Sequence, residues 1–168
     1  MSREKIIATI HEVPEVIHAG LAGSDKTVGH DEKLRTLTVS AGCLAALLAD
    51  PGWSQNHLGK IYGLCSGWLL ALGEKTPGEK ICAERERQQE LFKAGKFTFT
   101  CASRIADPVR KLRVLMEEIG EVAEAIEKLE MKKLDAACFL RSELTQVAAV
   151  AVAWLEALAA PATKEASK

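Results

Sequence analysis

The feature that most constrains the fold of this chain is a weak internal repeat. When residues 33–48 are aligned with residues 111–126, six of the sixteen positions are identical, and most of the others are apolar in both segments. Further along, Trp68-Leu69 aligns with Trp154-Leu155. Because the matching segments keep their order along the chain, we interpret the sequence as two tandem copies of one helical unit.

Composition and periodicity predict an all-α fold. The chain is 48% hydrophobic and has 1 tyrosine and 5 prolines, and its richness in alanine and leucine favours helix over sheet. Pro77-Gly78 is the natural junction, which gives a first repeat at 1–76, a second at 78–160 and a flexible tail at 161–168. Six helices are expected, of which the second, third, fifth and sixth have the strongest apolar faces and would pack into a four-helix core. The expected helices cover residues 3–19, 31–49, 54–73, 78–94, 108–130 and 133–159.

Short polar segments set the expected helix ends. Asp50-Pro51-Gly52 is a strong stop signal after the second helix. Asp107 is a favourable N-cap with proline at the next position, so the fifth helix should begin there. Residues 20–27 resemble a phosphate-binding loop only faintly, because Asp25 stands where that loop needs a glycine before its lysine. We interpret this segment as a polar connection.

Charge and cysteine content narrow the functional classes. A net charge of -1 gives no general affinity for nucleic acid or anionic membranes, so we expect neither as a partner. The N-terminus does not have the pattern of a signal peptide, and the longest apolar run, Val147–Leu155, is too short to span a bilayer. The 5 cysteines form no CxxC pair, which favours reduced thiols and a cytoplasmic location.

Two pairs of polar residues are the candidate functional groups. Glu118 and Glu121 lie three residues apart beside an apolar stripe, and Glu143 and Gln146 repeat that spacing on the last helix. Two antiparallel helices could bring these turns together, so that three carboxylates and one amide oxygen converge. Such hard oxygen ligands suit Mg²⁺, which also accepts phosphate oxygens. The alternative is a plain helical scaffold, in which these acids form a solvated face paired with lysine or arginine.

The acidic pattern also resembles a known family. Glu117-Glu118-x-x-Glu121, a spacer of 21 residues and Glu143-x-x-Gln146 resemble the EExxE and ExxD signature of the MazG-like nucleotide pyrophosphohydrolases, which are relatives of the all-α dUTPases. The likeness covers about residues 84–158. It implies hydrolysis of a nucleoside or deoxynucleoside triphosphate to the monophosphate and pyrophosphate, with Mg²⁺ as the cofactor and Mn²⁺ as a substitute.

The resemblance also implies roles for single residues. Glu118, Glu121 and Glu143 would be metal ligands, and Glu117 would orient or deprotonate the attacking water, with Glu118 also placed among the catalytic groups. Gln146 departs from the usual aspartate: its amide oxygen can ligate Mg²⁺, but it brings no charge and cannot act as a base. This departure favours a rival function, a catalytically inactive module that binds a nucleotide or a protein.

Basic residues near the loop at 95–107 are candidates for holding substrate phosphates. Lys96 and Arg104 lie in that loop, and Lys111 lies one heptad before Glu118. The alternative for Lys111 is a structural role, because Lys33 occupies the same position in the first repeat.

The family usually builds its site from the helices of two subunits, which gives the repeat a physical meaning. The first repeat could act as an in-chain partner, making a pseudo-dimer, and a homodimer of such pseudo-dimers is compatible with the resemblance. The first repeat is degenerate, because it has no carboxylate at the four aligned positions, which are Ser40, Cys43, His57 and Lys60.

Overall fold

The computed structural model describes residues 14–46 and 48–159, and within these ranges the chain is all-helical. The all-α prediction is therefore confirmed. The expected helix at 3–19 lies mostly outside the described residues, and the tail at 161–168 lies wholly outside them. The described helices are α2 (Pro14–Ser24), α3 (His30–Ala46), α4 (Pro51–Ala71), α5 (Pro77–Lys93), α6 (Pro108–Glu130) and α7 (Ala136–Ala159).

Helices α4, α5 and α6 each have a proline in the first turn, for the same local reason in each case. A proline in the first turn loses no hydrogen bond, because the N–H group that it lacks would have no partner there. Asp107 caps α6 by accepting a hydrogen bond from the N–H of Val109 at 3.0 Å, as the sequence predicts. Asp50 caps α4 in the same way. The sequence signal at Asp50-Pro51 therefore starts α4, which begins three residues before the expected position 54. The preceding helix α3 ends at Ala46, before the expected position 49.

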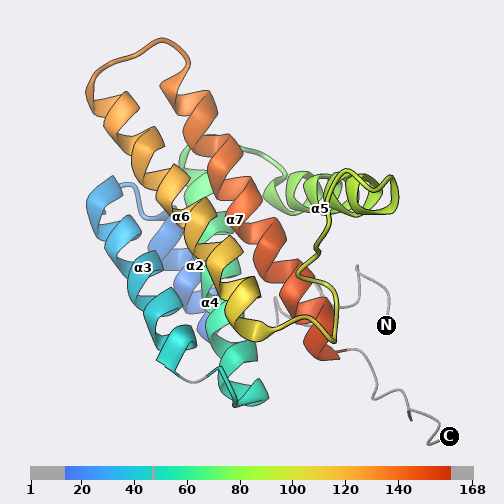
Figure 1. Ribbon diagram of the computed structural model, residues 1–168. Coiled ribbons are helices and arrows are strands. Elements are labelled where there is room, and N and C mark those ends of the chain that lie inside the picture. Colours follow the sequence, from blue (N-terminus) through green and yellow to red (C-terminus); the bar gives the residue numbers. More distant parts are fainter. Residues whose placement is uncertain (1–13, 47, 160–168) are drawn as a thin grey trace, which may run out of the picture.

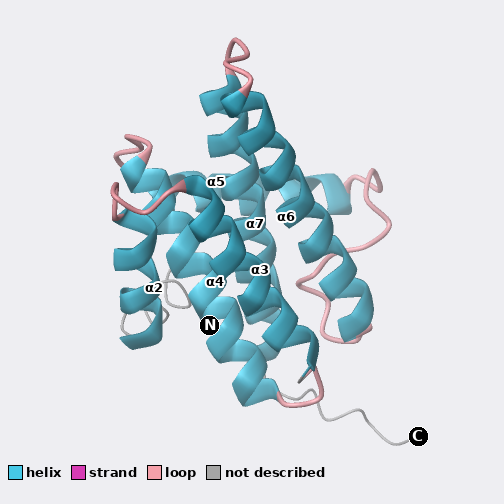
Figure 2. Ribbon diagram, turned by 90° about the vertical axis from the view of Figure 1, so that its left-hand side faces the viewer, coloured by secondary structure: helices cyan, strands magenta, loops and turns pink. Residues whose placement is uncertain are grey.

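The helices pack around α7. This helix contacts α4, α5 and α6, while α3 contacts α4 and α6 (Figure 1, Figure 2). The side chains of Trp68 on α4 and Trp154 on α7 are among the largest that are buried in the core. The connection between α6 and α7 projects beyond the other helices in both views. In Figure 1, α5 crosses α7 on the side away from α3.

The expected polar connection at 20–27 is wrong for residues 20–24, which belong to α2. The glycines in this segment serve a close helix crossing rather than a loop. A Cβ atom at Gly67 on α4 would lie 2.0 Å from the carbonyl oxygen of Gly20, and a Cβ atom at Gly23 would lie 2.3 Å from the carbonyl oxygen of Leu64. Glycine on both helices therefore allows α2 and α4 to approach backbone to backbone.

The composition of α7 has a structural explanation. By length and hydropathy alone, Ala136–Ala159 could cross a membrane, although the sequence shows no long uninterrupted apolar run. More than half of its apolar window is buried inside the protein. A central core helix meets the same criteria, and the contacts of α7 with three other helices account for its apolar character.

Candidate functional site

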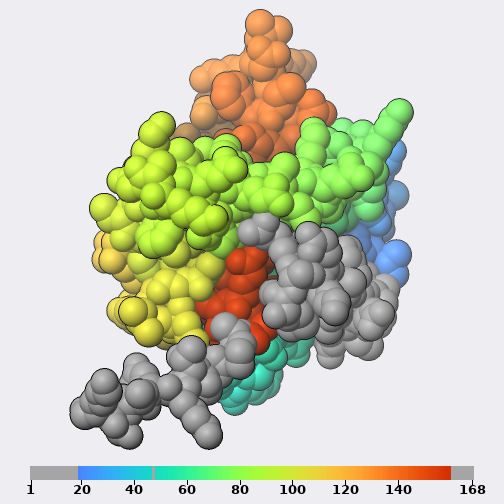
Figure 3. All heavy atoms as spheres, turned by 90° about the vertical axis from the view of Figure 1, so that its right-hand side faces the viewer, coloured from blue at the N-terminus to red at the C-terminus, as the bar shows by residue number. Residues whose placement is uncertain are grey.

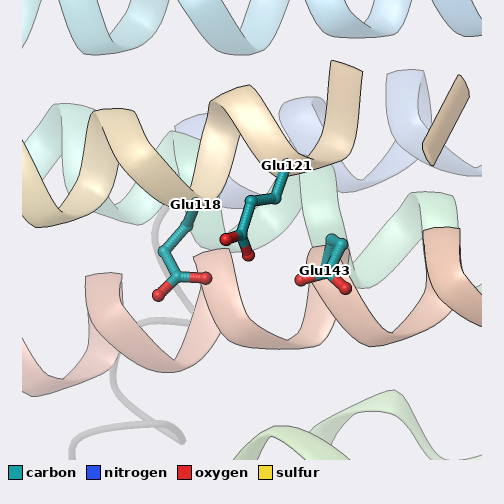
Figure 4. Close-up of side chains that lie close together, drawn as sticks. All are labelled: Glu118, Glu121 and Glu143. Atoms are coloured by element: carbon teal, nitrogen blue, oxygen red, sulfur yellow. The ribbon is translucent and has the colours of Figure 1, made fainter. Parts of the chain in front are cut away.

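Three glutamates from two helices converge at one point of the structure. Glu118 and Glu121 extend from α6 toward Glu143 on α7 (Figure 4). One carboxylate oxygen from each lies within 4.8 Å of the other two. Within residues 14–46 and 48–159, this is the one group of three acidic, histidine or cysteine side chains with such spacing.

The apolar faces of the two helices determine this meeting. Leu115, Ile119 and Val122 bury one face of α6 against its neighbours. Glu118 and Glu121 flank that face, so they emerge at the edge of the contact between α6 and α7. On α7, Leu144 and Val147 are buried, and the adjacent Glu143 and Gln146 are half-buried at the same edge. Packing of the core therefore brings acidic side chains together.

Burial makes Glu118 the most perturbed of the three acids. Desolvation, followed by the charges of Glu121, Glu143, Glu117 and Glu84, raises the pKa of Glu118 to about 7. Its Oε2 atom is buried and has no hydrogen-bond partner. A buried carboxylate oxygen without a donor is costly, so this atom is suited to an added cation or proton.

Glu143 is also perturbed, but it has polar neighbours. Desolvation, and after it the hydrogen bond and charge of Glu121, raise the pKa of Glu143. The Gln146 side-chain amide donates a hydrogen bond to the Glu143 carboxylate, which acts in the opposite direction. Gln146 thus orients one of the converging acids.

Mutual repulsion between the three carboxylates is substantial. At an effective dielectric constant of about 20, two charges about 5 Å apart repel by about 3 kcal/mol. The pKa values of Glu118 and Glu143 are raised partly for this reason. The site is therefore at its most stable with a proton or a cation present.

Glu118 and Glu121 form part of one wall of a pocket of about 450 Å³, whereas Glu143 is not among its lining residues. Glu117, Glu118, Glu121 and Gln146 line this wall. The loop that follows α5 also contributes to the lining, with Phe97 and Phe99 among other residues. A pocket of this size with an acidic wall and aromatic side chains can accept a small organic ligand.

Two features of the loop that follows α5 set its course beside the pocket. At its start, Gly95 takes a φ of 71°, a conformation that favours glycine and turns the chain away from α5. Further along, the guanidinium of Arg110 on α6 lies 4.3 Å from the centroid of the Phe99 ring. The contact between Arg110 and Phe99 holds the aromatic part of the loop beside the acidic helix.

The three predicted phosphate-binding residues lie in different places. Lys96 lines the pocket beside the acids, as the prediction requires. Arg104 is exposed and does not line the pocket. Lys111 is 3% exposed, and its ammonium lies 5.8 Å from the centroid of the Trp154 ring. The roles of Arg104 and Lys111 in substrate binding stay predictions, and the location of Lys111 favours the structural alternative.

Arg87 is the pocket residue that sequence reasoning missed. It lines the pocket from α5, and its guanidinium donates to the Glu84 carboxylate at 2.7 and 2.8 Å. The hydrogen bond to Glu84 is the main cause of the raised pKa of Arg87, and the charge of Glu118 makes a smaller contribution in the same direction. A stretch of alternating charges on α5 gave no signal that singled out this arginine.

The first repeat repeats one contact of the second and lacks its acids. Lys33 is 3% exposed, and its ammonium lies 5.8 Å from the centroid of the Trp68 ring, as Lys111 does from that of Trp154. At the positions aligned with the acids, Cys43 is exposed and His57 is buried, with its ring stacked on that of Trp53 at 5.3 Å.

Comparison with known proteins gives no assignment. No protein-family model, curated protein sequence or solved structure shows significant similarity to this chain.

Proposed function

We propose that this protein hydrolyses a nucleoside or deoxynucleoside triphosphate to the monophosphate and pyrophosphate, with Mg²⁺ as its cofactor. The observation that carries the proposal is the convergence of Glu118, Glu121 and Glu143. Glu118 and Glu121 also line a pocket that presents cations and aromatic rings. The MazG-like sequence pattern supports the same activity.

The donor set fits a magnesium ion. With metal–oxygen bonds of about 2.1 Å, an octahedral ion places its ligand oxygens about 3–4 Å apart. The three carboxylate oxygens lie within 4.8 Å of one another, so small side-chain rotations would bring them to these separations. The buried, unpartnered Oε2 of Glu118 would gain a ligand bond that it lacks in the protein alone. Gln146 is a fourth oxygen donor at the same edge, or it serves by orienting Glu143.

The residues of the chain then have distinct tasks. A bound Mg²⁺ would neutralise phosphate charge and favour nucleophilic attack by water. Glu117 is exposed at the pocket and can accept a proton from the attacking water. The oxygen of that water bonds to the α phosphorus. The bond between the α and β phosphates breaks, and pyrophosphate leaves with the electron pair.

Cations and rings in the pocket suit the remainder of a nucleotide. Lys96 and Arg87 can bind phosphate oxygens that the metal does not hold. Phe97 is 42% exposed, so its ring is free enough to stack on a base. The lining therefore provides a partner for the phosphates and one for the base.

The first repeat is proposed to be the in-chain partner of the second. The matched placement of Lys33 against Trp68 and of Lys111 against Trp154 supports a common origin of the two halves. The contacts of α3 with α4 correspond to those of α6 with α7, and α4 contacts α7 across the two halves. The result is a pseudo-dimer with one acidic site and one half that serves packing.

A catalytically inactive nucleotide-binding or protein-interaction module is the second candidate. The specific observation in its favour is Gln146, which is neutral where the family pattern has an acid and which donates to Glu143. With one fewer negative charge, such a site can bind a metal–nucleotide complex without turning it over.

The test is product formation from a panel of nucleoside triphosphates, with and without Mg²⁺. We expect equal amounts of monophosphate and pyrophosphate, and loss of both in Glu121→Ala. Glu130→Ala is the matched control, because Glu130 is another exposed glutamate on α6 and lies away from the pocket. Nucleotide binding without turnover would favour the inactive module instead.

A further inference from the structure

A second hollow adjoins the acidic pocket, in the groove where α5 packs against α7. It has a volume of about 500 Å³ and is lined by Lys80, Glu84 and Arg87 from α5 and by Arg141 from α7, among others. Arg87 and Gln146 line both hollows, so the two meet at these side chains. Figure 3 shows this face, with α5 (green) lying below the projecting end of α6 and α7 (orange). We refer to this second hollow as the α5–α7 groove.

The α5–α7 groove is basic, in contrast to the pocket. Its lining contains three cations, and Glu84 is its one carboxylate. Lys80 forms an ion pair with Glu74, which does not line the groove, and Arg87 pairs with Glu84. An anion that enters the groove would therefore meet an excess of positive charge beside the acidic cluster.

Of the cations in this groove, Arg141 gives the clearest indication that an anionic ligand binds here. Its half-buried guanidinium donates to the carbonyl oxygen of Leu72 at 3.3 Å and to the Cys138 sulfur at 3.2 Å. It forms no ion pair with any residue in the described ranges 14–46 and 48–159. A guanidinium presents five donors in a plane and binds phosphate oxygens well, so Arg141 retains donors for an anion.

We propose that the α5–α7 groove binds the terminal phosphates of the substrate, and then the pyrophosphate that is released. This inference rests on the proposed function, because the acidic cluster fixes where the bond is cleaved. The order of groups along the two hollows matches an extended nucleotide. Phe97, Glu118 and Glu121 line the pocket. Gln146 and Arg87 lie at the junction, and Arg141 lies in the groove beyond.

Arg87 has a particular part in this arrangement. Its ion pair with Glu84 holds it at the junction of the two hollows, where it can exchange the carboxylate for a phosphate oxygen. Glu84 then competes with phosphate for the same guanidinium. Removal of the Glu84 charge should therefore strengthen anion binding, whereas removal of a groove cation should weaken it.

The experiment is a calorimetric titration of the full chain with inorganic pyrophosphate in the presence of Mg²⁺. We expect Arg141→Gln to weaken binding about tenfold, which corresponds to one charge-assisted hydrogen bond. Lys80→Gln should weaken binding less, and Glu84→Gln should strengthen it. Arg113→Gln is the matched control, because Arg113 is an exposed arginine on α6 that does not line the groove. Its affinity should equal that of the wild type.

The two proposals can fail separately. Wild-type pyrophosphate affinity in both Arg141→Gln and Glu84→Gln, or no pyrophosphate binding at all, would overturn the groove as a phosphate site. If Arg141→Gln does not fold, Lys80→Gln and Glu84→Gln decide the question by their opposite effects. If the cation variants hydrolyse triphosphate with an unchanged KM, the proposed activity stands and the groove is refuted as a phosphate site. Charge-dependent pyrophosphate binding without any hydrolysis would retain the anion site and refute the activity.

Discussion

Replacement of Glu118 by glutamine should stabilise the metal-free protein at pH 8. The folded protein raises the pKa of this carboxyl from 4.5 to about 7, mainly by burial and then by the neighbouring glutamates. Glutamine has nearly the same shape and cannot ionise. At pH 8 it therefore removes the cost of holding a half-buried negative charge beside Glu121 and Glu143.

The sign and size of this effect follow from proton linkage. Because the folded pKa is higher than the unfolded one, the folded state binds more protons between the two values. The contribution of Glu118 to stability is therefore greatest below pH 4.5 and is lost as the pH rises through about 7. At about 1.4 kcal/mol per pKa unit, the upper limit is about 3 kcal/mol, and we expect Glu118→Gln to gain about 1–3 kcal/mol at pH 8.

The assay is thermal unfolding of wild type and variant from pH 4.5 to pH 8, in EDTA. For a chain of this length, the gain corresponds to an increase in Tm of roughly 2–10 °C at pH 8, and the difference should shrink toward pH 4.5. The comparison of variant with wild type cancels the contributions of other titrating groups. Glu127→Gln, an exposed glutamate on the same helix, is the control and should show no such pH-dependent gain.

Addition of Mg²⁺ should reverse the ranking. The wild type should gain about 3 kcal/mol when the ion is present at about one hundred times its dissociation constant, and Glu118→Gln should gain much less. A variant that is no more stable than the wild type at pH 8 would refute the electrostatic reasoning. Equal stabilisation of both proteins by Mg²⁺ would refute the role of Glu118 as a ligand.

Three further predictions test the packing. Gly67→Ala should destabilise the protein by roughly 3 kcal/mol or more in denaturant unfolding, because its Cβ would overlap the α2 backbone. Gly120 has open space around it, so Gly120→Ala should instead increase the free energy of unfolding by roughly 0.5–1 kcal/mol. His30 accepts a hydrogen bond from the Trp68 indole at 3.1 Å, and its pKa is lowered chiefly by burial. Its contribution to stability should therefore be lost as the pH falls below 6.5. The variant His30→Ala should flatten that part of the profile of stability against pH. A chain that begins at Lys80 should be insoluble or oligomeric in size-exclusion chromatography, because it exposes the core faces of α6 and α7; a well-behaved monomer would contradict the pseudo-dimer.

The helices of this chain are largely readable from its sequence, because their ends have local causes. Asp107 and Pro108 start α6 where expected, and the start needs no tertiary contact. The prediction of a connection at Gly20 and Gly23 is wrong because glycine favours both a loop and a close helix crossing. Only the facing Gly67 on α4 decides between the two, and its proximity depends on the fold.

The acidic cluster was also accessible from sequence. The spacing of Glu118 and Glu121 beside an apolar stripe, repeated at Glu143, indicates convergence when two helices pack. Lys111 lies one heptad before Glu118 and therefore on the same face of the helix, but seven residues correspond to about 10 Å along its axis. The Lys111 ammonium therefore lies 5.8 Å from the centroid of the Trp154 ring, and Lys111 does not line the pocket.

Arg87 and the basic groove could not be predicted, because they depend on how α5 crosses α7. Arg87 and Glu84 are an ordinary i, i+3 pair in sequence. Their position at the junction of two hollows follows from the orientation of α5, which no local pattern encodes.

The most direct test of the central claim is anomalous diffraction from crystals of the full chain soaked in Mn²⁺, a substitute for Mg²⁺. We expect an anomalous peak within coordination distance of the carboxylates of Glu118, Glu121 and Glu143, and no such peak in Glu121→Ala crystals. A wild-type map without density between these three side chains, at Mn²⁺ concentrations that saturate other sites, would contradict this claim.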